Sequence, residues 1–328
     1  MPVNYPYIFL SGFLLNLVFL FLFKRLSLKY DLLIYQGIPL IGGIAIALSF
    51  ILSCSLGFFL LGRLPEEITG IIIASLIIFI FGVIDDWREL SIVAKFLFQV
   101  IATLLLVIFG VKTQIAYIGN PANIMITFVW VLGITNAFNH LDIMDGLAGG
   151  TAAIVGSGLF VICLLNGDIN MAILSLAVTT ISLSFLIYNF PPARIYMGNS
   201  GSHFFGFVLA AIALAISYAP LERKIALLSP LLIFGFPIFD TAFITLMRIN
   251  KKKLPFKKTN DHLALRFLAL GNSKKKSLSI MLSLCFFFVL CGVVVSQAHN
   301  LLGIIIVASL FLVTFSLAMR LSKVIVDE

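Results

Sequence analysis

Charged residues are scarce in this chain. Lys, Arg, Asp and Glu make up 11% of its 328 residues, whereas hydrophobic residues make up 61%. A soluble globular domain carries about 25% charged residues, so the composition excludes that class. The apolar runs are about 20 residues long, and the alternating segments of about 10 residues that mark a membrane β-barrel are lacking. The composition therefore predicts an all-α, polytopic integral membrane protein.

Several other signals are also missing. The cysteines form no CxxC pair and no Cys/His spacing, so they are interpreted as packing residues and not as metal ligands or disulfides. No basic region precedes the first apolar run, which is therefore predicted to be a retained helix and not a cleaved signal peptide. There is no internal repeat, low-complexity segment or soluble insertion. We expect a single transmembrane domain over residues 1–328.

The apolar runs predict about 10–11 transmembrane helices. Eleven spans are expected at Tyr5–Phe23, Pro39–Leu61, Ile68–Ile84, Ile92–Val111, Ile124–Phe138, Leu147–Leu165, Met171–Tyr188, His203–Tyr218, Ile225–Met247, Leu278–Ser296 and Leu301–Ala318. The third and the fifth are short for a full span, so we expect both to continue into the polar segments that follow them.

Basic residues are unevenly distributed between the connections. With the N-terminus outside, 18 basic residues fall on the inside and 4 on the outside. The positive-inside rule therefore predicts an outer N-terminus and a cytoplasmic C-terminus. This placement explains the net charge of +8 as membrane topology and not as nucleic-acid binding.

This topology brings four polar segments to the cytoplasmic side of the membrane. They are Asp85–Asp86, Asn136–Asp145, Asn189–Ser202 and Asp240–Arg266. The outer connections are short and carry no comparable motif. The pattern predicts a multi-pass protein of the cell inner (plasma) membrane, with an active site at the cytoplasmic boundary.

The segment NAFNHLDIMDGLAGG places Asn136, Asn139, Asp142 and Asp145 at intervals of three residues. Residues three apart lie near one face of a helix, but the stripe drifts with each step. All four therefore share a face only if the helix ends within the segment, for which its glycines are suited. Carboxylates at the end of a membrane span indicate function; the alternative is a solvated surface loop.

The segment GVIDDWREL carries adjacent carboxylates at the end of a span. Asp85 and Asp86 could hold a hard cation such as Mg²⁺, or one of them could act as a base. The alternative is a charged surface turn. Lys95 enters the next span, where it could extend to the membrane surface or pair with a phosphate.

Two further segments carry candidate ligand groups. In YNFPPARIYMGNSGS, Gly198, Gly201 and Ser202 precede a span, and a helix N-terminus of this kind offers N–H groups to an anion; the alternative is a plain turn. Asp240 lies inside an apolar span and is a functional candidate for that reason. His262 and Arg266 are four residues apart on an expected helix and are candidates for phosphate contact.

In this order, the four motifs resemble those of the polyprenyl-phosphate N-acetylhexosamine-1-phosphate transferases of glycosyl transferase family 4. This group includes the phospho-MurNAc-pentapeptide translocase and the undecaprenyl-phosphate GlcNAc-1-phosphate transferases. The resemblance runs from about Gln36 to Lys276, and QGIPLIGGIAI is closer to the GlcNAc-type enzymes. It implies transfer of a sugar 1-phosphate from a UDP-N-acetylhexosamine to polyprenyl phosphate, with release of UMP. It also implies a requirement for Mg²⁺, with Mn²⁺ as the alternative, and by analogy a homodimer.

The resemblance also implies roles for individual residues. Asp85, Asp86 and His262 would be catalytic, and Asp86 and Asn199 would hold the metal. The implied substrate-binding residues are Lys95, Asn136, Asn139, Asp142, Asp145, Asn189, Asp240 and Arg266.

The sequence departs from the family pattern at two places. Asn199 stands where the family has a metal-binding Asp in M-G-D-x-G-S, and an amide oxygen is a poorer Mg²⁺ ligand than a carboxylate. In DHLALR, Ala264 or Leu265 occupies the position of a second His. An alternative hypothesis is therefore a catalytically silent relative that binds lipid phosphate or nucleotide sugar. A third hypothesis is an ion-coupled transporter. Two observations weaken it: the carboxylates cluster at one surface, and no inverted repeat is visible.

Overall fold

The computed structural model describes residues 5–218, 223–252, 261–324 and 326. The chain forms two compact units, Met1–Ser217 and Tyr218–Glu328, and each is described by itself. Unit 1 contains α1 (Tyr5–Tyr30), β1 (Ile34–Tyr35), β2 (Ile38–Pro39), α2 (Gly42–Leu61), α3 (Glu66–Trp87), α4 (Ile92–Ile108), α5 (Asn120–Leu141), α6 (Leu147–Asn166), α7 (Ile169–Asn189) and α8 (Gly198–Ala215). Unit 2 contains η1 (Lys224–Leu228), α9 (Ser229–Ile233), α10 (Gly235–Asn250), α11 (Leu263–Ala269), α12 (Lys274–Gln297) and α13 (Asn300–Ser322). The prediction of a single domain stays a prediction.

Within the described residues, nine helices are long and apolar enough to cross a membrane. The shorter helix α4 is also apolar, and η1–α9 together with α10 forms a further candidate span bent by 68°. Each of the eleven predicted spans coincides with one of these elements, which confirms a polytopic helical membrane protein. As expected, α3 and α5 continue into the polar motifs.

The ninth predicted span is not one continuous helix. It bends between α9 and α10, at Phe234 and Gly235. Pro237 falls in the first turn of α10, where its missing N–H breaks no helical hydrogen bond. The apolar run gave no indication of this bend, because hydropathy reports membrane length and not helix direction.

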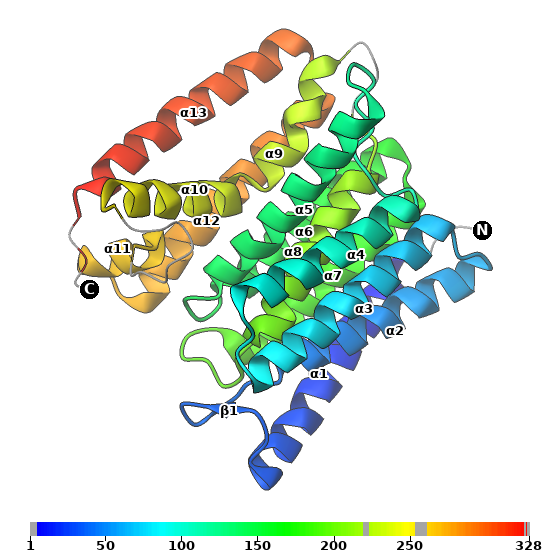
Figure 1. The fold of residues 1–328 in the computed structure, drawn as a ribbon, viewed down its shortest axis with the longest axis vertical. Coiled ribbons are helices and arrows are strands. Elements are labelled where there is room, and N and C mark those ends of the chain that lie inside the picture. Colours follow the sequence, from blue (N-terminus) through cyan, green and yellow to red (C-terminus); the bar gives the residue numbers. More distant parts are fainter. Residues whose placement is uncertain (1–4, 219–222, 253–260, 325, 327–328) are drawn as a thin grey trace. The chain divides into compact units, whose positions relative to one another are not determined.

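Helix α8 lies at the centre of unit 1. It packs against α2, α3, α5, α6 and α7 (Figure 1). Of its most apolar 18-residue stretch, 83% is buried. In α1 only 22% of the corresponding stretch is buried, so most of α1 is left for lipid contact. The packing is close because Gly43 of α2 and Gly82 of α3 both lie against the first turn of α8. The beginning of α8 is therefore fixed from two sides.

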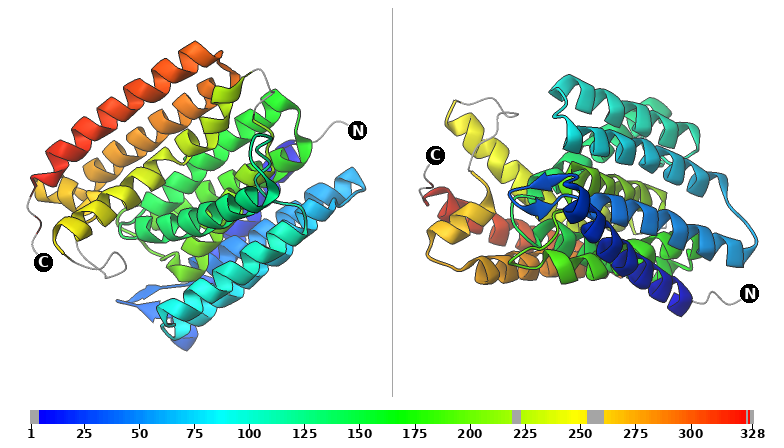
Figure 2. Two further views of the ribbon diagram at one scale, coloured as in Figure 1. Left: turned by 45° about the horizontal axis from the view of Figure 1, so that its top comes forward. Right: turned by 90° about the horizontal axis from the view of Figure 1, so that it is seen from below.

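A short hairpin joins α1 to α2. Ile34 pairs with Pro39 and Tyr35 with Ile38, and the two-residue turn has positive φ at Gln36 (52°) and Gly37 (79°), as a tight primed turn requires. The hairpin projects from one end of the helices of unit 1 (Figure 2). The segment QGIPL belongs to the stretch that resembles the GlcNAc-type enzymes, but its sequence did not indicate strands. Backbone hydrogen bonds from Tyr196 to Pro39 and from Gly42 to Tyr196 connect this segment to the loop before α8.

We predict that Gly82→Ala destabilises the protein and that Gly133→Ala does not. A Cβ at Gly82 would lie 2.4 Å from Ser200 Cα, whereas a Cβ at Gly133 has no neighbour within 4 Å. Overpacking costs about 1–3 kcal/mol, while Ala in place of Gly in an open helix gains up to about 1 kcal/mol. Melting temperatures in detergent would measure both. Equal melting temperatures of the two variants would contradict the close α3–α8 contact.

Candidate active site

The first motif ends α3 with a buried ion pair. Asp85 Oδ2 lies 2.6 Å from Lys95 Nζ of α4, and its Oδ1 accepts a hydrogen bond of 2.8 Å from the backbone N–H of Leu90. The Asp85 side chain is fully buried and that of Lys95 is 25% exposed. Lys95 is thus bound to a carboxylate and does not simply extend to the membrane surface.

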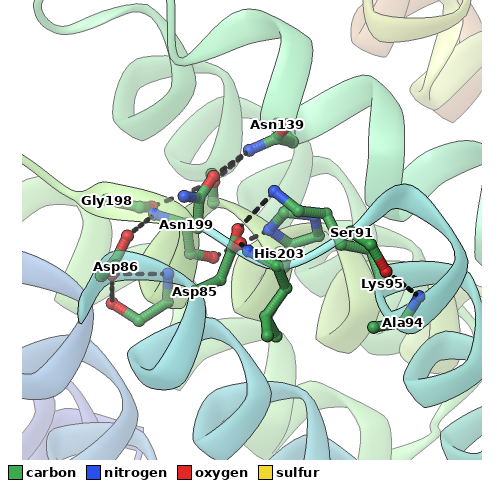
Figure 3. A network of polar contacts seen from close by, with 12 residues as sticks. Asp85, Asp86, Ser91, Ala94, Lys95, Asn139, Gly198, Asn199 and His203 are labelled. Atoms are coloured by element: carbon green, nitrogen blue, oxygen red, sulfur yellow. Dashed lines mark hydrogen bonds and ion pairs between the residues drawn. The ribbon is translucent and has the colours of Figure 1, made fainter. Parts of the chain in front are cut away.

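The second carboxylate of this motif caps α8. Asp86 Oδ1 accepts from the backbone N–H of Asn199 at 2.7 Å, and Oδ2 accepts from the N–H and the hydroxyl of Ser200 at 3.0 and 2.6 Å (Figure 3). The sequence predicted an anion at this helix N-terminus, and in the described residues that anion is a side chain of the protein itself. Gly198 permits the approach, because its φ is +72° and a Cβ there would lie 2.6 Å from Asp86 Oδ2.

The helix that carries the four polar residues ends within their segment, which is the condition that the sequence set for a shared face. α5 ends at Leu141, Asp142 is its C-cap, and Gly146 begins α6 with φ 80°. Asn136, on α5, exchanges hydrogen bonds of 2.8 and 3.3 Å with Gln99 of α4.

Asn139 extends from the last turns of α5 toward α8. Its Nδ2 donates to Asn199 Oδ1 at 2.9 Å and to Ser202 Oγ at 3.1 Å (Figure 3). Its partners are thus on the Gly/Ser motif that Asp86 caps, and these contacts bring the first three motifs together at one end of unit 1.

Asp86, Asp142 and Asp145 form what we call the acidic cluster. Desolvation, followed by the charges of Asp86 and Asp145, raises the pKa of Asp142 well above its usual value. More than a third of the Asp142 surface is nevertheless exposed to solvent. Because the charges of Asp86 and Asp145 act on Asp142, a bound cation or a proton at this position would relieve the repulsion.

The third motif connects the loop before α6 to the loop before α8. Asn189 is buried; its Oδ1 accepts from the N–H of Gly146 and its Nδ2 donates to the carbonyl of Ile195, each at 2.9 Å. Asp145 Oδ2 accepts from the N–H of Ala193 at 3.1 Å. The amide that the resemblance assigned to substrate is therefore already hydrogen-bonded to two loops.

The predicted metal pair of Asp86 and Asn199 stays a prediction. Both oxygens of Asp86 accept hydrogen bonds from α8, and Asn199 Oδ1 accepts one from Asn139, so a cation held here would have to share these oxygens. No group of three or more His, Cys, Asp or Glu side chains in metal-binding geometry occurs within the described residues. Asp142 and Asp145 provide further carboxylate oxygens of the kind that a hard cation prefers.

The fourth motif lies in unit 2. Asp240 is buried; its Oδ1 accepts from the N–H of Leu263 at 3.3 Å, and its Oδ2 lies 3.9 Å from His262 Nδ1. His262 and Asp240 are thus brought together within unit 2. Their placement relative to the first three motifs stays a prediction. The sequence also predicts contacts with anionic lipid for Lys251–Lys253, Lys257 and Lys258. Of these, Lys253, Lys257 and Lys258 lie outside the described residues.

Arg266, predicted to contact phosphate, is buried and bonded to other groups of the protein. Its side chain is 2% exposed, NH1 donates to the carbonyl of Leu321 at 2.9 Å, and NH2 lies 3.1 Å from Asp261. The guanidinium thereby caps the C-terminus of α13 and pairs with a carboxylate. A substrate contact by Arg266 stays a prediction. To make this contact, the guanidinium would have to bind the substrate in addition to its present partners.

Sequence reasoning did not identify three residues beside the site. Ser200 bonds Asp86, and His203 Nδ1 lies 2.9 Å from the carbonyl of Asn199. Desolvation, and then the charges of Asp145, Tyr35 and Asp142, raise the pKa of Tyr196, which places its phenol near the acidic cluster. His203 carried a usable signal, because an ionisable residue within an apolar span is a functional candidate.

The chain is similar in sequence to known proteins. The family model of glycosyl transferase family 4 matches residues 68–217. The chain is 32% identical over 282 residues to a probable undecaprenyl-phosphate N-acetylglucosaminyl 1-phosphate transferase of Bacillus subtilis, covering 82% of this chain and 76% of the relative. It is 30% identical to a decaprenyl-phosphate N-acetylglucosaminephosphotransferase of Mycobacterium leprae, over 73% and 68% of the two chains. It is 23% identical to the undecaprenyl-phosphate alpha-N-acetylglucosaminyl 1-phosphate transferase of Escherichia coli K12, over 88% and 83%.

We predict that Lys95→Met destabilises the protein by about 2 kcal/mol, because it leaves the buried Asp85 carboxylate without its cation. The double variant Asp85→Asn/Lys95→Met should regain part of this loss, since no charge is then left unpaired. Thermal unfolding in detergent, across the wild type, both single variants and the double variant, gives the coupling energy. A double variant no more stable than Lys95→Met would contradict the ion pair.

Proposed function

The chain belongs to glycosyl transferase family 4, and from this premise we propose that it transfers N-acetylhexosamine 1-phosphate from a UDP-sugar to a polyprenyl phosphate. The three relatives described above are all named as GlcNAc phosphotransferases, so GlcNAc 1-phosphate is the foremost group to test. These names favour an active transferase over the silent alternative.

In the proposed reaction, an oxygen of the lipid phosphate attacks the β-phosphorus of the UDP-sugar. A new P–O bond forms, and the bond from the β-phosphorus to the oxygen that bridges the α-phosphate breaks. UMP leaves with the bonding electron pair, and the lipid keeps a diphosphate-linked sugar. Phosphoryl transfer of this kind depends on positioning and on charge neutralisation.

The observation that most supports the proposal is the convergence of three separate motifs at one end of unit 1. Asp86 and Asn139 both bond the first turn of α8, and the charges of Asp86 and Asp145 act on Asp142. This end of unit 1 is polar and built from helix ends, which is where a charged substrate can reach the end of a membrane-spanning bundle.

We assign the roles as follows. Asp85, held by Lys95, acts beside the lipid phosphate, and Asp86 fixes the first turn of α8. Asn139, Asp142 and Asp145 face the nucleotide. Asn136 and Asn189 support these residues from Gln99 and from the loop backbone. Asp240, His262 and Arg266 of unit 2 keep the catalytic and substrate-binding roles that the resemblance implies.

Mg²⁺ is the proposed cofactor, with Mn²⁺ as its substitute. Asp142 and Asp145 would hold it, since both ions prefer oxygen ligands. The cation would offset the charge of the acidic cluster and of the substrate phosphates. The reaction is placed at the cytoplasmic face of the inner membrane, and a homodimer is proposed by family analogy.

We predict that the purified protein releases UMP from at least one UDP-N-acetylhexosamine in the presence of undecaprenyl phosphate and Mg²⁺. Asp85→Ala should lower the rate at least about 100-fold, because it removes a carboxylate from the reacting phosphates. Gly133→Ala serves as a control in α5 with open space around it. Folded wild-type protein that releases no UMP from any sugar, with Mg²⁺ or Mn²⁺, would refute the proposal.

The proposed orientation is tested separately. A green fluorescent protein fused after Glu328 should fluoresce, and alkaline phosphatase at the same position should be inactive, because only the former matures in the cytoplasm. An active phosphatase fusion would place the C-terminus outside and reverse the assigned face.

A further inference from the structure

Asn199 is held at three atoms by three different side chains. Its N–H donates to Asp86 at 2.7 Å, its carbonyl lies 2.9 Å from His203 Nδ1, and its Oδ1 accepts from Asn139 at 2.9 Å. Since a carbonyl can only accept, His203 Nδ1 carries the proton in this contact. Residue 199 is therefore pre-positioned by α3, by α5 and by its own helix (Figure 3).

The neighbouring hydroxyl determines which way the two amides face. Ser202 Oγ donates to the carbonyl of Gly198 at 3.0 Å, and a hydroxyl has only one proton to donate. Ser202 must therefore accept its second hydrogen bond, so the atom of Asn139 that faces it at 3.1 Å is Nδ2. The same Nδ2 faces Asn199, and the Asn199 atom that meets it is Oδ1.

The side-chain amide of Asn199 consequently turns its NH₂ group away from Asn139. This Nδ2 has no hydrogen-bond partner among the described residues, and it is not among their fully buried unpaired atoms, so part of its surface is accessible. An Asp at this position would present a carboxylate, which attracts cations. Asn199 presents two N–H donors, which attract anions.

We propose that Asn199 binds the diphosphate of the nucleotide substrate directly, by donating hydrogen bonds from Nδ2. The inference rests on the proposed function, which supplies the diphosphate, and it changes the role of residue 199 from metal ligand to anion donor. A neutral donor also leaves one negative charge fewer beside Asp86, so phosphate binding at this position depends less on a divalent cation.

Two variants separate this role from a structural one. Asn199→Asp keeps the shape but replaces the donor by a carboxylate. Asn139→Asp leaves residue 199 intact; because the introduced carboxylate can only accept, Asn199 should turn its NH₂ inward and its oxygen outward. Calorimetric titration of the purified full chain with UDP, in EDTA and in Mg²⁺, measures phosphate binding. Uridine, which carries no phosphate, is the matched control ligand.

In EDTA, both variants should bind UDP about tenfold more weakly than the wild type, a change of about 1.4 kcal/mol, with uridine binding by Asn199→Asp unchanged. Mg²⁺ should raise the UDP affinity of Asn199→Asp by a larger factor than that of the wild type. If the wild type releases UMP but both variants bind UDP in EDTA as it does, the inference is overturned and the transferase proposal stands. If the wild type neither binds UDP nor releases UMP, both are overturned.

Discussion

The hydrogen bonds of the Asp86 carboxylate at the first turn of α8 are the contact on which the arrangement of unit 1 depends. Two backbone N–H groups and one hydroxyl of α8 converge on a side chain from α3. An uncapped helix start within a membrane bundle would leave N–H groups unpaired at a cost of several kcal/mol. Because a carboxylate meets that requirement, the Gly/Ser motif is held against the paired-Asp motif. The proposed active site lies where these two motifs meet.

The close approach that this contact needs is provided by glycine. Gly43 and Gly82 let α2 and α3 reach the backbone of α8, and Gly198 takes the positive φ that admits the carboxylate. Small residues are a general means of packing helices in lipid, where no hydrophobic force draws them together. Here the same residues determine how near the polar side chains of three helices come to one another.

Electrostatics then divides the carboxylates by role. Asp85 is neutralised by Lys95, and Asp86 is satisfied by N–H groups, so neither is left as a bare buried charge. Among the described residues no cation lowers the pKa of Asp142, and that pKa is raised. The charge that no partner offsets is therefore concentrated on Asp142, on the side where substrate and cation are proposed to bind, while Asn199 adds a neutral donor next to Asp86.

The sequence alone determined the fold class and the eleven candidate spans, and it indicated that a helix could end within the segment from Asn136 to Gly150, because hydropathy, glycines and polar spacing are local signals. It also identified Asp85, Asp142 and Asn199 as candidates. Only the tertiary structure decided where that helix ends and which partners these residues have: that Asp86 caps a helix 113 residues away, that Arg266 holds the end of α13, and that Asn199 turns its donor away from Asn139. A side chain's role depends on which donors and acceptors surround it, and those come from helices whose mutual packing no local pattern specifies.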